Sequence, residues 1–365
     1  MQNKRDFILA YSIDMTILNV FHSKNKIDWG KAMKNYIEEE KILDNVEPLN
    51  GYRVDCYRQA LLPAIIHCGR DIRPFLLANV GHFEYDKTFS FSEIPMLNYD
   101  TALKNLGIDQ QYLYTTKNNF IENICESINK NKIVIAYVDT FSYNRFPALY
   151  SNTHSRHGIL IYGYNIINQT FYIIDSNFIE NFEREKAEIS FDDLLIAHNE
   201  MIEHYKIQNF IELISPLDQY NENYTLAYIS KYLEFIKRNP NIFNNSIQSL
   251  NNYAIYFKNL FDEKEKIIRT ASPIYTSFNR AINLRHLEYV AYRNVFENVE
   301  NILECLDEMI GLYNYVRAVM YKSLYTQEYR DQSFRKCSKL IDKIIELEKL
   351  YYKLQCEDIL IENIR

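Results

Sequence analysis

The sequence predicts an α+β domain followed by an all-α domain. Between Asp6 and Leu217 short β-rich runs alternate with helical stretches, and after Pro216 the β signals almost vanish. The stretch that follows carries apolar stripes at helical spacing. We therefore expect an α+β domain at residues 1–215, with an N-terminal extension at residues 1–45, and an α-helical bundle domain at residues 216–365.

The α+β half has four β-rich runs and three helical stretches. The last two runs are joined by the polar link from Ile166 to Thr170, which predicts an antiparallel hairpin. The expected helices lie at residues 29–43, 56–67 and 120–129. The β-rich runs, in chain order, are FILAYS, KIVIAYVDTF, GILIYGYN and TFYIID.

In the C-terminal half, two stripes of apolar residues repeat with steps of four and three. Pro240 and Pro273 punctuate the earlier helices, so we expect four or five helices in an antiparallel bundle. Side chains at this spacing are typical of bundle core. The first stripe is Val295, Val299, Ile302, Leu306, Met309, Tyr313, Val316 and Met320, and the second is Leu340, Ile344, Leu347, Tyr351 and Leu354.

Composition restricts the class of protein. Of 365 residues, 47% are hydrophobic and 24% charged, which is globular composition and excludes fibrous or largely disordered chains. A net charge of -7 gives no broad attraction for a nucleic-acid backbone and argues against that partner. The six cysteines show no zinc-site or disulfide spacing, so we expect no metal and a reducing compartment. With no signal-peptide pattern and no 18-residue apolar run, the sequence indicates a cytoplasmic protein without a membrane partner.

Cys56 is the first candidate for chemistry. A polar loop ends at Asp55, and apolar residues then recur at helical spacing, which places Cys56 at the first turn of a helix. The partial positive charge of a helix N-terminus lowers the pKa of a thiol and favours the nucleophilic thiolate. Asp55 opposes this effect unless its side chain caps the helix. Alone, the position fits a buried cysteine equally well.

His157 and Asp175 favour the catalytic interpretation of Cys56 over that of a buried cysteine. His157 opens the strand GILIYGYN, and its hairpin partner TFYIID ends in Asp175, so the hairpin should bring the imidazole and the carboxylate together. Such a carboxylate holds an imidazole in one tautomer while the other ring nitrogen faces a nucleophile. In the order Cys, His, Asp, the three residues are the components of a papain-type site.

The segments GYRVDCYRQAL, IVIAYVDTFSYNRFPALYSNTHSRHGILIYGYN and FYIIDSN, in this order, resemble the N-terminal domain of the butirosin biosynthesis protein H family. The resemblance covers about residues 50 to 180. The whole chain, with its helical half, is similar to the papain-like amide synthase of closthioamide biosynthesis. These resemblances imply a papain-like cysteine-protease fold in which Cys56 is the nucleophile, His157 the general base and acid, and Asp175 the residue that orients His157.

The implied activity is that of an amide synthase, an acyltransferase of bacterial natural-product biosynthesis. An acyl group moves from an acyl carrier protein thioester, through a Cys56 acyl-enzyme, to a small amine, and no cofactor is needed. The sequence leaves open a cysteine peptidase or deamidase, because the same triad performs both reactions. It also leaves open a non-catalytic papain-like scaffold with a partner-binding bundle, and a homo-oligomer.

Further residues are candidates for supporting roles. Asn50, six positions before Cys56, is the side-chain amide available for oxyanion stabilisation, where relatives use the longer Gln. Asn177 is an alternative partner for the imidazole, and His154 either enters the same cleft or is an exposed loop residue. Tyr137 and Asp139 are candidates for contacting the substrate or supporting the site.

Two other segments stand out. Where relatives carry an aliphatic-proline-tyrosine turn, this chain has Ser142-Tyr-Asn-Arg-Phe-Pro147, so we expect a remodelled wall of the acyl pocket. Arg280, Arg285, His286 and Arg293 form a basic stretch. Such a stretch is ordinarily a solvated helix face, and it could also dock an acidic carrier protein.

Overall fold

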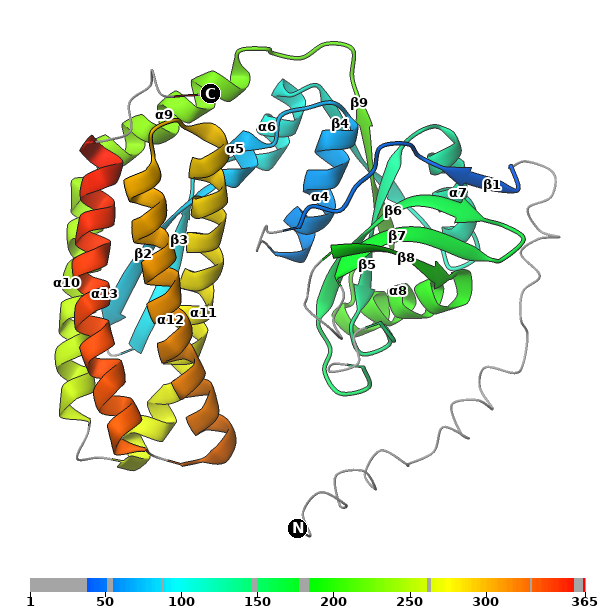
Figure 1. The fold of residues 1–365 in the computed structure, drawn as a ribbon. Helices are drawn as coiled ribbons and strands as arrows, with labels where there is room; N and C mark the ends of the chain where they lie inside the picture. Colours follow the sequence, from blue (N-terminus) through cyan, green and yellow to red (C-terminus); the bar gives the residue numbers. More distant parts are fainter. Residues whose placement is uncertain are drawn as a thin grey trace, which may run out of the picture.

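The computed structural model describes residues 38–50, 55–86, 88–145, 150–176, 184–260, 264–328, 330–357 and 364. Within this part the chain is α+β with an antiparallel sheet, followed by a helical region, as the sequence predicts. In Figure 1 the sheet half and the helical half lie on opposite sides of the molecule. The domain boundary at residues 215 and 216 stays a prediction.

The main sheet has seven strands in the described part of the chain, paired in the order β4-β9-β5-β6-β7-β8, with β1 on β6. All paired strands within this sheet run antiparallel to each other. Long apolar runs such as Ile133–Val138 explain why β5 is buried on both faces. The strands are β1 (Glu40–Ile42), β4 (Ile108–Tyr114), β5 (Ile133–Asp139), β6 (Arg156–Asn165), β7 (Thr170–Ser176), β8 (Arg184–Ser190) and β9 (Phe210–Pro216).

Short helices pack against this sheet. Helix α4 (Cys56–His67) contacts β5 and β6, and α8 (Phe191–Tyr205) contacts β5 and β8. Helix α7 (Phe120–Asn129) buries Ile121, Ile124, Cys125 and Ile128, one face at helical spacing. The short helix α6 (Tyr99–Asn105) contacts β4, whereas α5 (Arg73–Leu76) contacts helices of the C-terminal half.

The predictions for this half can now be compared. The helices at 56–67 and 120–129 are confirmed, and so is the hairpin of β6 and β7. The helix expected at 29–43 is wrong at its end, because Glu40–Ile42 pairs with β6 as strand β1. Edge pairing supplies backbone partners that local periodicity does not reveal. Residues 29–37 and the run FILAYS lie outside the described residues.

A hairpin from the first half packs into the helical half. Strand β2 (Asn79–Asp86) contacts helix α10 (Pro240–Asn259), and strand β3 (Thr88–Pro95) contacts helix α11 (Lys264–Val295) (Figure 1). The backbone N–H of Phe83 donates to Ser246 Oγ at 2.9 Å, and Ser277 Oγ donates to the carbonyl of Phe89 at 3.1 Å. The ring of Phe89 stacks on Tyr253 with centroids 4.0 Å apart. The bundle therefore depends on residues far upstream of Pro216.

Five helices follow Pro216 in the described residues, as expected: α9 (Tyr224–Arg238), α10 (Pro240–Asn259), α11 (Lys264–Val295), α12 (Glu300–Thr326) and α13 (Asp331–Glu357). The first predicted stripe is buried throughout, which confirms it as core. It does not lie on one helix, because α11 ends at Val295 and α12 begins at Glu300. Pro240 starts α10, whereas Pro273 lies inside α11 and does not end it.

The basic stretch is a solvated face only in part, because Arg280 and Arg293 are exposed whereas Arg285 is buried. Arg285 is 1% exposed, and it pairs with Glu288 at 2.5 Å and with Glu348 at 2.8 Å. A surface interpretation of Arg285 is therefore wrong, because the carboxylate of Glu348 comes from α13, 63 residues away, and cannot be foreseen from local pattern. In the described part of the chain, every helix is too short or too polar to cross a membrane.

Candidate active site

Cys56 is the first residue of α4 and is half-buried. The side chain of Asp55 caps the helix by accepting from the backbone N–H of Arg58 at 2.9 Å, and it also binds Arg58 Nε at 2.5 Å. The capping that the sequence left open is thus present. The carboxylate that would disfavour a thiolate is engaged by the helix end and by a guanidinium, although its charge still raises the pKa of Cys56.

The imidazole of His157 lies against the carboxylate of Asp175. His157 Nε2 and Asp175 Oδ1 are 2.8 Å apart, and the two side chains are 7% and 0% exposed. Strand pairing explains the contact, since β6 and β7 are neighbours with Leu160 opposite Ile174. The predicted neighbourhood of His157 and Asp175 is therefore confirmed. With Nε2 engaged, Nδ1 is the ring nitrogen left for the thiol of Cys56.

The thiol and the imidazole favour a charged pair. Burial by itself raises the pKa of Cys56, but its hydrogen bond with His157, the charge of that ring and the N–H of Gly158 together bring the pKa below its ordinary value. Burial also lowers the pKa of His157, yet Asp175 and Cys56 outweigh it and raise this pKa to about 9. The arrangement therefore stabilises a thiolate beside an imidazolium, and the thiolate is the nucleophilic form of a cysteine.

Asp175 is held by three donors. Besides His157, the backbone N–H of Ser176 donates to Oδ1 at 2.7 Å, and the hydroxyl of Tyr143 donates to Oδ2 at 2.5 Å. Burial raises the pKa of Asp175, but His157, Tyr143 and Arg184 outweigh it and hold this pKa below its usual value. Tyr143 belongs to the segment in which a remodelled pocket wall was expected, and sequence reasoning gave Tyr143 itself no role.

A second buried carboxylate fixes the start of α4. Glu212 on β9 is fully buried and accepts from the hydroxyls of Tyr57 at 3.0 Å and Tyr137 at 2.9 Å, and from Gln110 Nε2 at 2.6 Å. Tyr57 follows Cys56, so this network ties the start of α4 to three strands. Burial raises the pKa of Glu212. Sequence reasoning missed Glu212, because only the pairing of β9 with β4 and β5 brings it here.

The other predicted residues lie as follows. The ring of Tyr137 borders the site. It lies 3.6 Å from the point that a Cβ on Gly158 would occupy, and the carbonyl oxygen of Cys56 lies 3.7 Å from the same point. Asn50 is exposed, and its Oδ1 accepts from the backbone N–H of Arg184 at 2.8 Å. Asn177, the alternative partner of the imidazole, lies outside the described residues.

His154 belongs to a separate group. Its Nδ1 lies 2.9 Å from Asp139 Oδ2, and its ring stacks on Phe141 and on His204 with centroids 4.3 and 3.7 Å apart. Asp139 is fully buried and also accepts from the backbone N–H of Phe141 at 2.9 Å. The structure thus joins the predicted residues His154 and Asp139 to each other. In the described part of the chain, no three His, Cys, Asp or Glu side chains are grouped to hold a metal ion.

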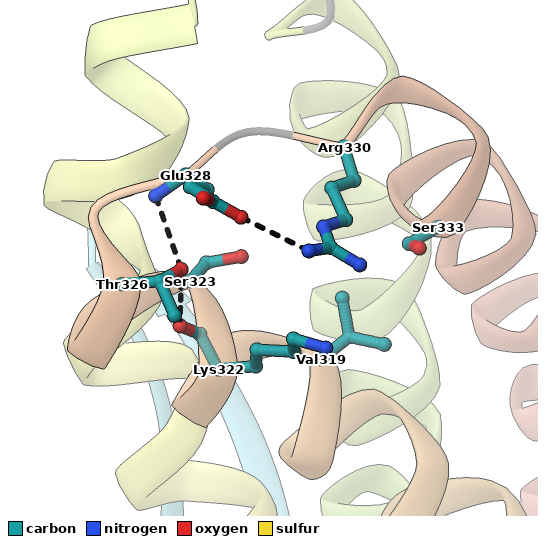
Figure 2. A pocket seen from close by; sticks show the side chains of 7 residues that line it. All are labelled: Val319, Lys322, Ser323, Thr326, Glu328, Arg330 and Ser333. Carbon is teal, nitrogen blue, oxygen red and sulfur yellow. Dashed lines mark hydrogen bonds and ion pairs between the residues drawn. The ribbon is translucent and has the colours of Figure 1, made fainter. Parts of the chain in front are cut away.

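A small pocket of about 60 Å³ lies elsewhere, at the turn between α12 and α13 (Figure 2). Glu328 and Arg330 pair across it at 3.0 Å, and Ser323 and Ser333 line it. None of the predicted site residues lines it, and its serines have no histidine beside them among the lining residues. Chemistry-bearing residues therefore converge at the start of α4 and not at this pocket.

Comparison with known proteins finds a similarity over the same residues. Residues 55–176 match the family model of butirosin biosynthesis protein H, N-terminal. The resemblance predicted from the sequence is confirmed over this third of the chain. The matched segment begins at Asp55, the N-cap of α4, and ends just after Asp175. No curated protein matches the chain.

Proposed function

We propose that the chain is a papain-type, cysteine-dependent acyltransferase that forms amides in the biosynthesis of a natural product. The observation that carries this proposal is the relay of Asp175, His157 and Cys56, in which His157 Nε2 lies 2.8 Å from Asp175 and the opposite side of the ring serves the thiol. The butirosin biosynthesis protein H match supports a biosynthetic enzyme. The acyl carrier protein donor and the amine acceptor are part of the proposal.

The first half-reaction forms the acyl-enzyme. The Cys56 thiolate attacks the thioester carbonyl, and the tetrahedral intermediate carries its charge on oxygen. The backbone N–H of Cys56, at the open end of α4, and the side-chain amide of Asn50 are the donors we assign to that oxygen. Collapse breaks the bond to the carrier's sulfur, which takes the proton of the His157 imidazolium and leaves as a thiol.

The second half-reaction forms the amide. An amine attacks the acyl-enzyme carbonyl, and His157, now neutral, accepts the proton that the nitrogen loses. Collapse releases the amide and restores the thiolate beside the imidazolium. Asp175 keeps the ring in one orientation through both steps and stabilises its positive charge. A peptidase or deamidase would differ in its donor and in using water as the acceptor.

The test uses intact-protein mass spectrometry with an acyl thioester and no amine. Wild type should gain the mass of one acyl group, and Cys56→Ala should gain none and should lose turnover by several powers of ten. Cys68→Ala is the matched control, because Cys68 lies just past the other end of α4, where burial raises its pKa to about 11. An adduct that persists in Cys56→Ala contradicts the assignment.

The same experiment separates the alternatives. Addition of a small amine should discharge the adduct to an amide faster than water does. Discharge by water alone, together with cleavage of a peptide substrate, would favour a hydrolase. A wild-type protein that forms no adduct with any carrier-bound thioester, and whose biological activity survives alkylation of Cys56, would favour the scaffold.

A further inference from the structure

Arg184 is a buried positive charge beside the proposed site. The residue is 5% exposed, and its Nε, Nη1 and Nη2 atoms are all buried without a hydrogen-bond partner in the described part of the chain. A buried guanidinium is ordinarily paired with a carboxylate or other acceptors, because its desolvation costs free energy that only such partners offset. An unpartnered one is therefore expected to serve a ligand.

The neighbouring arginines show the difference. Arg58 binds Asp55 at 2.5 Å, and Arg145 binds Glu185 at 2.9 Å. Both pairs lie within this same half of the protein, so carboxylates are available there. Glu185 directly follows Arg184 in the chain, but the carboxylate of Glu185 pairs with Arg145.

The position of Arg184 points to the reacting atoms. It is the first residue of β8 and lies opposite Ser176, one step from Asp175. Its backbone N–H is held by Asn50 at 2.8 Å. Burial lowers the pKa of Arg184 to about 10, while the charges of Asp175 and Cys56 act in the opposite direction, so the guanidinium stays charged at neutral pH and interacts with both groups.

We propose that Arg184 binds a carboxylate of one of the two substrates, beside the thiol of Cys56. The inference rests on the proposed acyl transfer. A guanidinium is a planar fork that matches a carboxylate with two parallel hydrogen bonds. A phosphate on a carrier's prosthetic arm is separated from the thioester by the length of that arm, so the carboxylate belongs to the acyl group or to the amine.

A pair of alkylating reagents tests the carboxylate site without any acyl transfer. Iodoacetate and iodoacetamide both form a bond between the Cys56 sulfur and carbon and release iodide, and they differ in the carboxylate. Wild type should react with iodoacetate in a saturable manner. The ratio of iodoacetate to iodoacetamide rates should fall about tenfold or more in Arg184→Met, as expected for the loss of a charge-assisted hydrogen-bonded pair.

Two further variants distinguish specific binding of a carboxylate from electrostatic attraction by any nearby positive charge. Arg184→Lys keeps the charge but loses the fork, so saturation by iodoacetate should weaken while part of the rate ratio remains. Arg145→Met removes a nearby charge that already has a partner and should leave the ratio unchanged. An unchanged ratio in Arg184→Met, or an equal fall in Arg145→Met, overturns the proposal.

Thermal unfolding shows whether Arg184 is structural. Since the guanidinium has no partner among the described residues, Arg184→Met should melt at the wild-type temperature or above it. A lower melting temperature with an unchanged alkylation ratio would mean that the charge holds the fold. If Arg184→Met cannot be prepared folded, loss of saturation in Arg184→Lys supports the site, and unchanged saturation overturns it.

Transfer assays then locate the carboxylate. Two thioesters that differ by a carboxylate on the acyl group, and two amines that differ by a carboxylate, should show a preference in one pair that Arg184→Met loses. No preference in either pair, from an enzyme that transfers acyl groups, overturns the substrate assignment. If wild type transfers nothing, the proposed function fails, and the alkylation ratio still decides whether Arg184 binds carboxylates.

Discussion

Arg184 at the start of β8 and Arg285 within α11 are buried to a similar extent, with 5% and 1% exposed, but their surroundings are opposite. Arg285 Nη2 donates to both carboxylate oxygens of Glu348, at 3.0 and 2.8 Å, and its Nη1 donates to Glu288 at 2.5 Å. Its guanidinium also lies over the ring of Tyr351, with the centroid at 4.7 Å. Arg184 has no such partner in the described residues.

The two halves use buried charge differently. In the helical half, Arg285, Glu288 and Glu348 form a closed network with the hydroxyl of Tyr313, in which one guanidinium binds two carboxylates within the core. In the sheet half, the group of Cys56, His157 and Asp175 includes a cysteine that is only partly buried. A closed network, in which the charged groups bind one another, specifies how helices pack. The group of Cys56, His157 and Asp175 is the open network, which leaves capacity for a substrate.

The largest expected effect tests the open network. His157→Ala removes both the counter-ion of the thiolate and the proton carrier, so acyl transfer should fall by several powers of ten. Asp175→Asn should cost less, because the ring keeps its position and loses mainly the stabilisation of its charge. Steady-state transfer rates and the burst of acyl-enzyme measure both effects.

His154→Ala is the matched control. His154 also pairs with a buried aspartate, but it stacks on Phe141 and His204 in a separate group. Its rates should stay near those of wild type. An inactive His154→Ala with an active His157→Ala would place the base three residues earlier in the chain and would make the closeness of His157 and Asp175 structural only.

The closed network should respond in stability. Arg285→Met leaves Glu288 and Glu348 without their cation in a sealed core, so the free energy of unfolding should fall by about 3–5 kcal/mol. Arg335→Met, which removes an exposed pair with Asp331, should cost at most about 1 kcal/mol. Chemical denaturation measures both. Equal losses of unfolding free energy in the two variants would show that the buried pairs of Arg285 stabilise the fold no more than the exposed pair of Arg335.

The sequence was sufficient where local pattern decides the structure. The helix start at Cys56 follows from a polar loop, a capping aspartate and apolar spacing, and the structure has both the Asp55 cap and the buried apolar residues of the helix. The contact of His157 with Asp175 follows from two adjacent strands joined by a short turn. Both rest on neighbours close in the chain, for which periodicity and turn residues carry the information.

Contacts between distant segments could not be predicted in this way. Arg285 was assigned to a helix surface because its partner Glu348 comes from another helix. The link of Glu212 to Tyr57 spans 155 residues, and the packing of Phe83 against Ser246 spans 163. Strand β1 was expected to be helical because its pairing with β6 supplies the backbone partners that decide its conformation. Such contacts depend on tertiary packing, which no single segment encodes.

The smallest expected effect concerns Tyr143, whose hydroxyl donates to Asp175 Oδ2 at 2.5 Å. The pKa of Asp175 is lowered from its ordinary 3.8, so its charged form stabilises the fold at pH values above 3.8. That contribution is lost as the pH falls through the lowered pKa. Tyr143→Phe removes one cause of the shift and should cost about 1–2 kcal/mol near neutral pH. Urea unfolding should show this difference shrinking as the pH falls below 3.8.

Tyr164→Phe separates the charge from the hydroxyl. The hydroxyl of Tyr164 donates to the neutral Asn129 Oδ1 at 2.5 Å, and its ring is also fully buried. Its loss should cost a similar free energy of unfolding that does not change with pH in the acid range, because a neutral amide does not titrate there. If the two variants showed the same pH dependence, Tyr143 would be an ordinary core hydrogen bond, and the open network would consist of Cys56, His157 and Asp175 alone.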